Sequence, residues 1–144
     1  MALNNYFDFA DDDFRYFKHN YDDGFIANSM GALAQSVCEK YMKHIISEYY
    51  NPDNPADFNR MNSMLRTHSL TNLINFLRNK MGIEFSDICE SEMRMIDGFY
   101  FSTRYPGDDS IELDKRGLEH CMRAIRSCRE ETIDICTKQN KQNV

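Results

Sequence analysis

The stretch FYFSTRYPG, residues 99–107, places a cation among aromatic side chains. Tyr105 follows Arg104 directly, and Tyr100 stands four residues before Arg104, about one helical turn. A guanidinium held beside aromatic rings suits a phosphate or a carboxylate, and a flat ring can stack on a nucleobase. The same residues can instead end a helix, with the arginine donating to its last carbonyl groups. The pattern leaves both alternatives open.

His68 is a second candidate for contact with a ligand, because it lies on an apolar helix face beside a break in the hydrophobic pattern. At such a position it can meet a ligand at a helix end. It can also be a core histidine that hydrogen-bonds a free backbone group. The pattern alone favours the core histidine.

Arg116 and His120 stand four residues apart, so their side chains are neighbours on a helix. A cation beside a histidine can serve a phosphate-cleaving site. The helical wheel places both residues opposite the apolar stripe, which favours a solvent-exposed face. Arg129 falls beside that apolar stripe. Either its aliphatic part lies along the apolar surface with the guanidinium in solvent, or the guanidinium pairs with an acid inside the bundle.

His44 and Glu48 have a spacing compatible with zinc, but the pattern offers no third ligand, so we expect an exposed ion pair. The chain has five cysteines and no CxxC pair, which favours buried reduced thiols in a cytosolic protein. We therefore expect no metal, no cofactor and no standard catalytic motif.

The composition limits the class of protein. The chain has 144 residues, 42% hydrophobic, and a formal net charge of -6. This size suits a single domain with its own core. The negative charge argues against broad binding of nucleic acid, which needs a basic face. No signal peptide and no membrane-spanning segment is expected, and we expect a cytoplasmic location.

The periodicity of apolar residues predicts an all-α chain. Helices are expected over residues 25–50, 58–81, 86–104 and 113–137. In the 58–81 segment the apolar residues before and after His68 fall on two different helix faces. We therefore expect a break at residues 67–69. Ser69 is expected to cap the piece after the break, and Gly82 to end it. Inward residues of the 86–104 helix are expected to be Ile88, Met95, Ile96 and Phe99.

These elements predict an antiparallel up-and-down bundle of four to five helices over residues 14–137. Residues 1–13 are expected to be flexible or to lead into a short helix. Residues 138–144 are expected to form a disordered tail.

Three motifs occur in one order along the chain: ALAQSVCEKYMKHII (32–46), HSLTNLINFL (68–77) and YFSTRYPG (100–107). An amphipathic helix follows them. In this order and spacing the chain resembles the HEPN family, named for nucleotide binding in higher eukaryotes and prokaryotes. The resemblance rests on the pairs and triplets Glu39-Lys40, His68-Ser69-Leu70 and Arg104-Tyr105-Pro106, with Tyr100, and covers about residues 14–137.

The resemblance implies a helical bundle, often a homodimer. Many members are partners of small nucleotidyltransferases, and others are metal-independent ribonuclease toxins. Ribonuclease members carry an arginine followed, after four to six residues, by a histidine. Here only three residues separate Arg116 from His120, and the first is Gly117. The resemblance therefore implies a non-catalytic member.

Our leading hypothesis is a non-catalytic HEPN-like bundle that binds a nucleotide-like small anion or serves as the substrate-binding partner of a nucleotidyltransferase. Arg104 would meet the anion, Tyr105 or Tyr100 would stack, and His68 would hydrogen-bond, with Lys40 a further candidate. One alternative is a ribonuclease that uses Arg116 and His120. Another is a purely structural dimeric module that docks through exposed N-terminal aromatics: Tyr6, Phe7 and Phe9.

Overall fold

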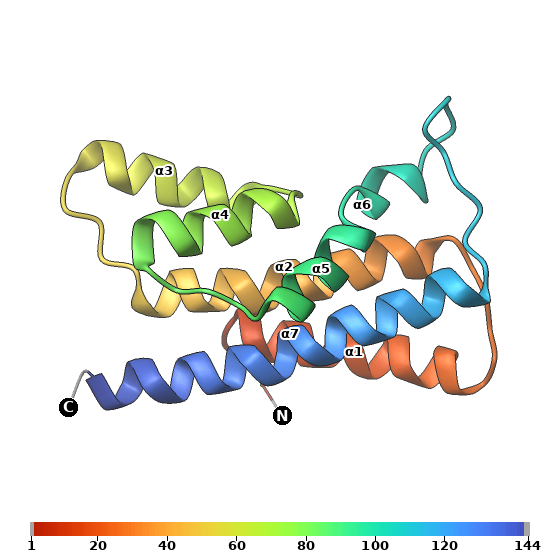
Figure 1. The fold of residues 1–144 in the computed structure, drawn as a ribbon, viewed down its shortest axis with the longest axis horizontal. Coiled ribbons are helices and arrows are strands. Elements are labelled where there is room, and N and C mark those ends of the chain that lie inside the picture. Colours follow the sequence, from red (N-terminus) through yellow and green to blue (C-terminus); the bar gives the residue numbers. More distant parts are fainter. Residues whose placement is uncertain (1, 143–144) are drawn as a thin grey trace.

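The computed structural model describes residues 2–142, which form six longer helices and the single-turn helix α6 (Figure 1). No strand occurs in this part of the chain. The helices are α1 (Tyr6–Asp22), α2 (Ser29–Tyr49), α3 (Pro55–Arg66), α4 (Leu70–Met81), α5 (Asp87–Ile96), α6 (Phe99–Ser102) and α7 (Lys115–Gln142). The predicted all-α class is confirmed, whereas the predicted count of four to five helices is too low.

Helix α2 is the centre of the fold, and it contacts each of the other helices. Figure 1 shows α2 and α7 running along the length of the molecule, with α1 beside one half of α2 and the α3–α4 pair beside the other half. Successive longer helices run in alternating directions. The core residues of α2 recur at three- and four-residue steps and are almost fully buried: Ala34, Val37, Cys38, Tyr41, Ile45 and Ile46.

Gly31 lets the segment after α6 approach the start of α2 closely. A Cβ atom at Gly31 would lie 2.8 Å from Cγ2 of Thr103, a distance that real side chains do not tolerate. Thr103 is itself buried, and its hydroxyl donates to the carbonyl of Phe99 at 2.6 Å. A larger residue at Gly31 would therefore displace the Thr103 side chain.

The predicted break between α3 and α4 is confirmed. α3 ends at Arg66, and the hydroxyl of Ser69 accepts the backbone N–H of Asn72 at 3.1 Å in the first turn of α4. Gly82 ends α4 with a φ of 64°, in the left-handed region that glycine adopts without strain.

The predicted helix over residues 86–104 is wrong in its second half. α5 begins after the Ser86 cap as expected but ends at Ile96. Gly98 then takes a φ of 96°, which turns the chain before α6. The expected inward positions are also corrected, since Ile88 is 73% exposed and Met95 52% exposed. The buried positions of α5 are Cys89, Glu90, Met93 and Ile96.

Both ends of the fold extend further than expected. The side chain of Asn5 accepts the N–H of Asp8, and α1 begins at Tyr6, so residues 6–13 are helical and belong to the bundle. α7 continues to Gln142, past the expected end at residue 137. The last two residues of the expected tail lie outside the described residues.

Two side-chain expectations are settled by the packing of α1. Arg129 pairs with an acid, since its Nε donates to Oδ1 of Asp11 at 2.9 Å. Phe7 packs edge-on against Tyr41, so of the N-terminal aromatics expected on the surface Phe9 is exposed and Phe7 is not.

The cysteines of the described chain are all free thiols, and four of them are buried. Burial raises the pKa of the Cys121 thiol to about 12. Helices both long and apolar enough to cross a membrane are absent from residues 2–142.

Candidate functional site

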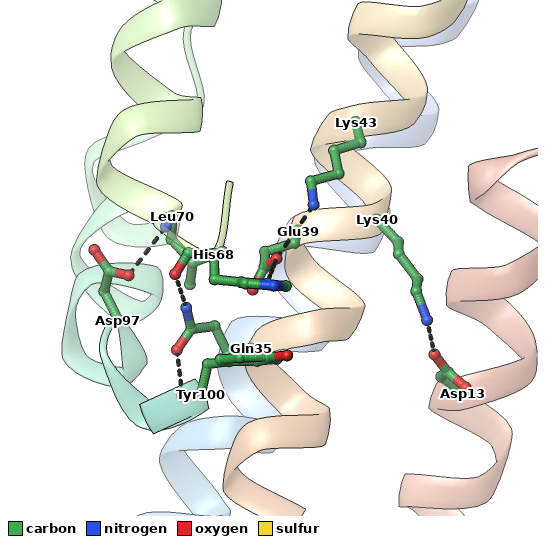
Figure 2. Close-up of polar contacts among 9 residues, drawn as sticks. All are labelled: Asp13, Gln35, Glu39, Lys40, Lys43, His68, Leu70, Asp97 and Tyr100. Atoms are coloured by element: carbon green, nitrogen blue, oxygen red, sulfur yellow. Dashed lines mark hydrogen bonds and ion pairs between the residues drawn. The ribbon is translucent and has the colours of Figure 1, made fainter. Parts of the chain in front are cut away.

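The fold brings four of the sequence candidates together. The imidazole of His68 stacks on the ring of Tyr100, with centroids 3.8 Å apart and planes 9° apart (Figure 2). Cζ of Arg104 lies 4.6 Å from the centroid of Tyr100 and 5.4 Å from that of Tyr105. Phe101 completes the group, edge-on to Tyr100 at 5.1 Å. We call these five residues the aromatic cluster.

Gln35 of α2 joins the two chain segments that carry the cluster. Its Nε2 donates to the backbone carbonyl of His68 at 2.6 Å, and its Oε1 accepts the backbone N–H of Tyr100 at 2.7 Å (Figure 2). The Gln35 side chain is fully buried. It thus satisfies two backbone groups that no helix pairs, and it sets the distance between the α3–α4 break and α6.

Asp97 fastens the same two segments from the other side. Its Oδ1 accepts the N–H of Leu70 at 3.0 Å, and its Oδ2 accepts the N–H of Thr71 at 3.1 Å and the Thr71 hydroxyl at 2.6 Å. A carboxylate at a helix N-terminus is favoured by both the free N–H groups and the helix dipole. The residue that ends α5 therefore caps α4.

A buried carboxylate, that of Glu39, contacts the imidazole of His68 from the interior of the bundle. Oε1 of Glu39 is 3.1 Å from Nδ1 of His68 and 3.3 Å from Nζ of Lys43, and both Glu39 and Lys43 are almost fully buried. Oε2 of Glu39 is buried and has no hydrogen-bond partner among the described residues. Burial raises the pKa of Glu39, and the charge of Lys43 and the hydrogen bond to His68 oppose that rise.

The outer side of the cluster is open to solvent. Phe101 is 56% exposed and Tyr105 52% exposed, and Arg104 is exposed as well. Tyr100 already carries His68 against its ring and Arg104 near it, so Phe101 and Tyr105 offer more room for a flat ligand than Tyr100 does. Sequence reasoning missed Phe101; its four-residue spacing to Tyr105 was the available signal.

A shallow hollow of about 710 Å³ adjoins the cluster on the loop side. Phe99, Phe101 and Tyr105 supply aromatic surface to it, and Asp97, Asp108 and Asp109 supply carboxylates. None of the described residues that line it is basic. Its chemistry favours a flat group that donates hydrogen bonds, so an anion would lie on the side of Arg104.

Other sequence candidates lie elsewhere. Lys40 points away from the cluster and pairs with Asp13 of α1 (Figure 2). Arg116 is exposed on α7, and Nδ1 of His120 faces Nη2 of Arg123 at 2.6 Å. Among the described residues, Lys40, Arg116 and His120 form no hydrogen bond, ion pair or ring contact with the aromatic cluster.

The expected exposed ion pair of His44 with Glu48 is wrong, since these residues form none in the described chain. His44 is half-buried and packs edge-on against Phe7 at 5.5 Å, and its burial lowers the pKa of the imidazole. Residues 2–142 also contain no group of three or more histidine, cysteine or acidic side chains placed to hold a metal ion.

Comparison of the chain with protein-family models, with curated proteins and with solved structures found no match. Function must therefore be argued from the site. The aromatic cluster combines an exposed cation, two exposed aromatic rings and an imidazole held by a buried acid, an arrangement suited to binding an anion that carries a flat group.

Proposed function

We propose that the chain is a non-catalytic, HEPN-type helical bundle that binds a nucleotide-like small anion at the aromatic cluster. One observation carries the proposal. The guanidinium of Arg104 forms no ion pair with any described residue, although it lies against two aromatic rings. Arg129, by comparison, is occupied by Asp11. An exposed, unpaired arginine positioned by rings is free to take a phosphate in a bidentate contact.

The roles of the other residues follow from their surroundings. A nucleobase would stack on Tyr105 or Phe101, whose rings are exposed, and its amino or ring N–H groups would donate to carboxylates of the adjoining hollow. His68 would hydrogen-bond the ligand between these two parts. Lys40 is left out of the proposed site because its ammonium pairs with Asp13.

The proposed lack of catalysis rests on the resemblance, since the arginine–histidine spacing of the ribonuclease members is not matched at Arg116 and His120. The same resemblance extends the proposal to a partner role. The nucleotide-like group would then belong to the substrate of a nucleotidyltransferase, presented to that enzyme by this bundle.

Thermal unfolding against AMP, GMP, CMP and UMP tests the proposal. A ligand at about 100 times its dissociation constant adds roughly 2.7 kcal/mol to the free energy of unfolding, which raises the melting temperature by several degrees. We expect this rise with at least one nucleotide, and its loss in Arg104→Ala.

Arg126→Ala is the matched control, because Arg126 is exposed on α7 and forms no ion pair with the described residues. This variant should retain the full nucleotide effect. A melting temperature that no nucleotide raises, or an equal rise in Arg104→Ala, would overturn the proposal. The first result would favour a structural dimeric module.

A further inference from the structure

The imidazole of His68 is partly exposed to solvent, and the buried carboxylate of Glu39 contacts it from the interior of the bundle. Its side chain is 41% exposed, whereas that of Glu39 is 2% exposed. Stacking on Tyr100 and the hydrogen bond from Gln35 to its own carbonyl restrain the plane and the backbone of the histidine. The contact between Nδ1 and Glu39 therefore has a fixed geometry. This contact decides which ring nitrogen of His68 carries the proton.

Lys43 determines the direction of that hydrogen bond. Its ammonium has only donors, and it points at the same Glu39 oxygen, Oε1, that faces Nδ1 of His68. An ionised Glu39 carboxylate can only accept at Oε1, and the adjacent charge of Lys43 favours that ionised form. Oε1 then accepts from both Lys43 and His68, so Nδ1 donates.

We infer that Glu39 is a positioning residue that holds His68 in its Nδ1–H tautomer and presents Nε2 to the site as a hydrogen-bond acceptor. Among the described residues Nε2 has no hydrogen-bond partner. The titratable groups in contact with the ring are Glu39 of α2 and Tyr100 of α6. Lys43 pairs with Glu39, and Arg104 lies over the ring of Tyr100.

This inference gives the ligand a further property, which rests on the proposed function. A neutral Nε2 acceptor requires an O–H or N–H group on the ligand. A ligand whose anionic end lies on Arg104 would therefore contact His68 through a sugar hydroxyl or a base amino group. Anions with no hydrogen-bond donor would use Arg104 alone.

The chain contains its own reference histidine. Nη2 of Arg123 lies 2.6 Å from Nδ1 of His120, and arginine can only donate. Nδ1 of His120 must accept, so His120 should carry its proton on Nε2. The two histidines are thus expected to show opposite tautomers in one spectrum.

The first experiment records the imidazole ¹⁵N–¹H correlations of the ligand-free protein at pH 8, above the range in which histidines ordinarily change charge. We expect His68 to be mainly the Nδ1–H tautomer and His120 mainly Nε2–H. Glu39→Ala removes the acceptor that faces Nδ1, so the Nδ1–H fraction of His68 should fall while His120 stays unchanged. A His68 that is mainly Nε2–H in the native chain would overturn the inference, and so would an unchanged His68 in Glu39→Ala. If that variant does not fold, the native spectrum decides alone.

The second experiment titrates AMP and sulfate into the same sample. AMP has hydroxyl and amino donors and should shift the Nε2 signal of His68; sulfate has none and should shift only the side-chain signal of Arg104. An Nε2 shift of equal size with sulfate would overturn the donor requirement. Absence of any AMP effect would overturn the proposed nucleotide function, whereas the tautomer of the ligand-free protein is read independently of it.

Discussion

The carboxylate of Asp97 caps a helix that begins at Leu70, 27 residues earlier in the chain. Asp97 is also the residue at which α5 ends and the chain turns toward α6. One side chain therefore sets both the start of α4 and the departure of the segment that carries Tyr100 and Arg104. Stability and the geometry of the aromatic cluster are coupled through it.

Replacing Asp97 with alanine should lower the free energy of unfolding by about 1–3 kcal/mol, because two backbone N–H groups and the Thr71 hydroxyl lose their acceptor. Urea unfolding measures the change. Asp97→Asn keeps one acceptor and should cost less. Asp108→Ala, in the exposed loop, should change stability by less than about 0.5 kcal/mol. Equal effects of the Asp97 and Asp108 alanine variants would contradict the capping role.

Replacing Gln35 with alanine should separate the α3–α4 break from α6. The Tyr100 N–H and the His68 carbonyl would both lose their partner, at a cost of about 2–4 kcal/mol together with the space vacated. Amide hydrogen exchange at Tyr100 should accelerate. Gln35→Glu retains an acceptor for Tyr100 and should protect that amide better than alanine does. Similar exchange in both variants would count against the role of Gln35 in joining the two segments.

Asp11 and Asp12 make a matched pair on α1. The Asp11 carboxylate accepts from Tyr41 at 2.5 Å and from two nitrogens of Arg129, whereas Asp12 pairs, among residues 2–142, with the exposed Arg15 alone. Asp11→Ala should cost about 1–3 kcal/mol by leaving the buried end of Tyr41 unpaired, and Asp12→Ala less than about 0.5 kcal/mol. Denaturant unfolding of both variants, with hydrogen exchange over residues 6–22, tests this. Equal losses would remove the case for Asp11 as the anchor of α1.

Stability should fall as the pH rises from 9 toward 12. In the unfolded chain the Cys121 thiol loses its proton near its ordinary pKa of 9.0, whereas burial raises its pKa in the folded chain to about 12. Within that window the folded state holds the extra proton, so rising pH favours unfolding, by at most about 1.4 kcal/mol per pH unit for each such thiol. Urea unfolding at pH 8, 9 and 10 measures the slope. Cys121→Ala should reduce it, and an identical slope would refute the assignment to Cys121.

A generic RNA incubated with the protein in the absence of metal should give no cleavage that depends on His120. His120 lies with Arg123 on a partly exposed face of α7, away from the aromatic cluster. Native protein and His120→Ala should therefore leave the RNA equally intact across pH 5–8. Cleavage that His120→Ala abolishes would support the ribonuclease alternative over the proposed binding function.

Local features were predictable because local chemistry decides them. The apolar periodicity predicted the helices after α1, Ser69 predicted an N-cap, and Gly82 predicted a helix end. The end of α5 was misplaced because the apolar pattern runs on through Ile96 and Phe99. The chain turns there because Gly98 takes a φ of 96°, while the Asp97 carboxylate accepts from Leu70 and Thr71, which lie far from it in the sequence.

The residue pattern and the resemblance both named His68, Tyr100 and Arg104 as candidates, but their contact could not be read from spacing. It depends on Gln35 pairing with both segments and on Gly31 admitting Thr103 to the surface of α2. Lys40 shows the converse case: a residue in a candidate motif that the packing of α1 assigns to Asp13 instead.

The sequence by itself determined the helical class, several helix ends and the residue types available for binding, because these follow from backbone propensity, capping and the period of apolar side chains within one segment. Only the tertiary structure decided which of those residues lie together and which nitrogen of His68 faces Glu39. Those outcomes depend on contacts between α2, the α3–α4 break and α6, and such contacts form only when the segments pack together around one core.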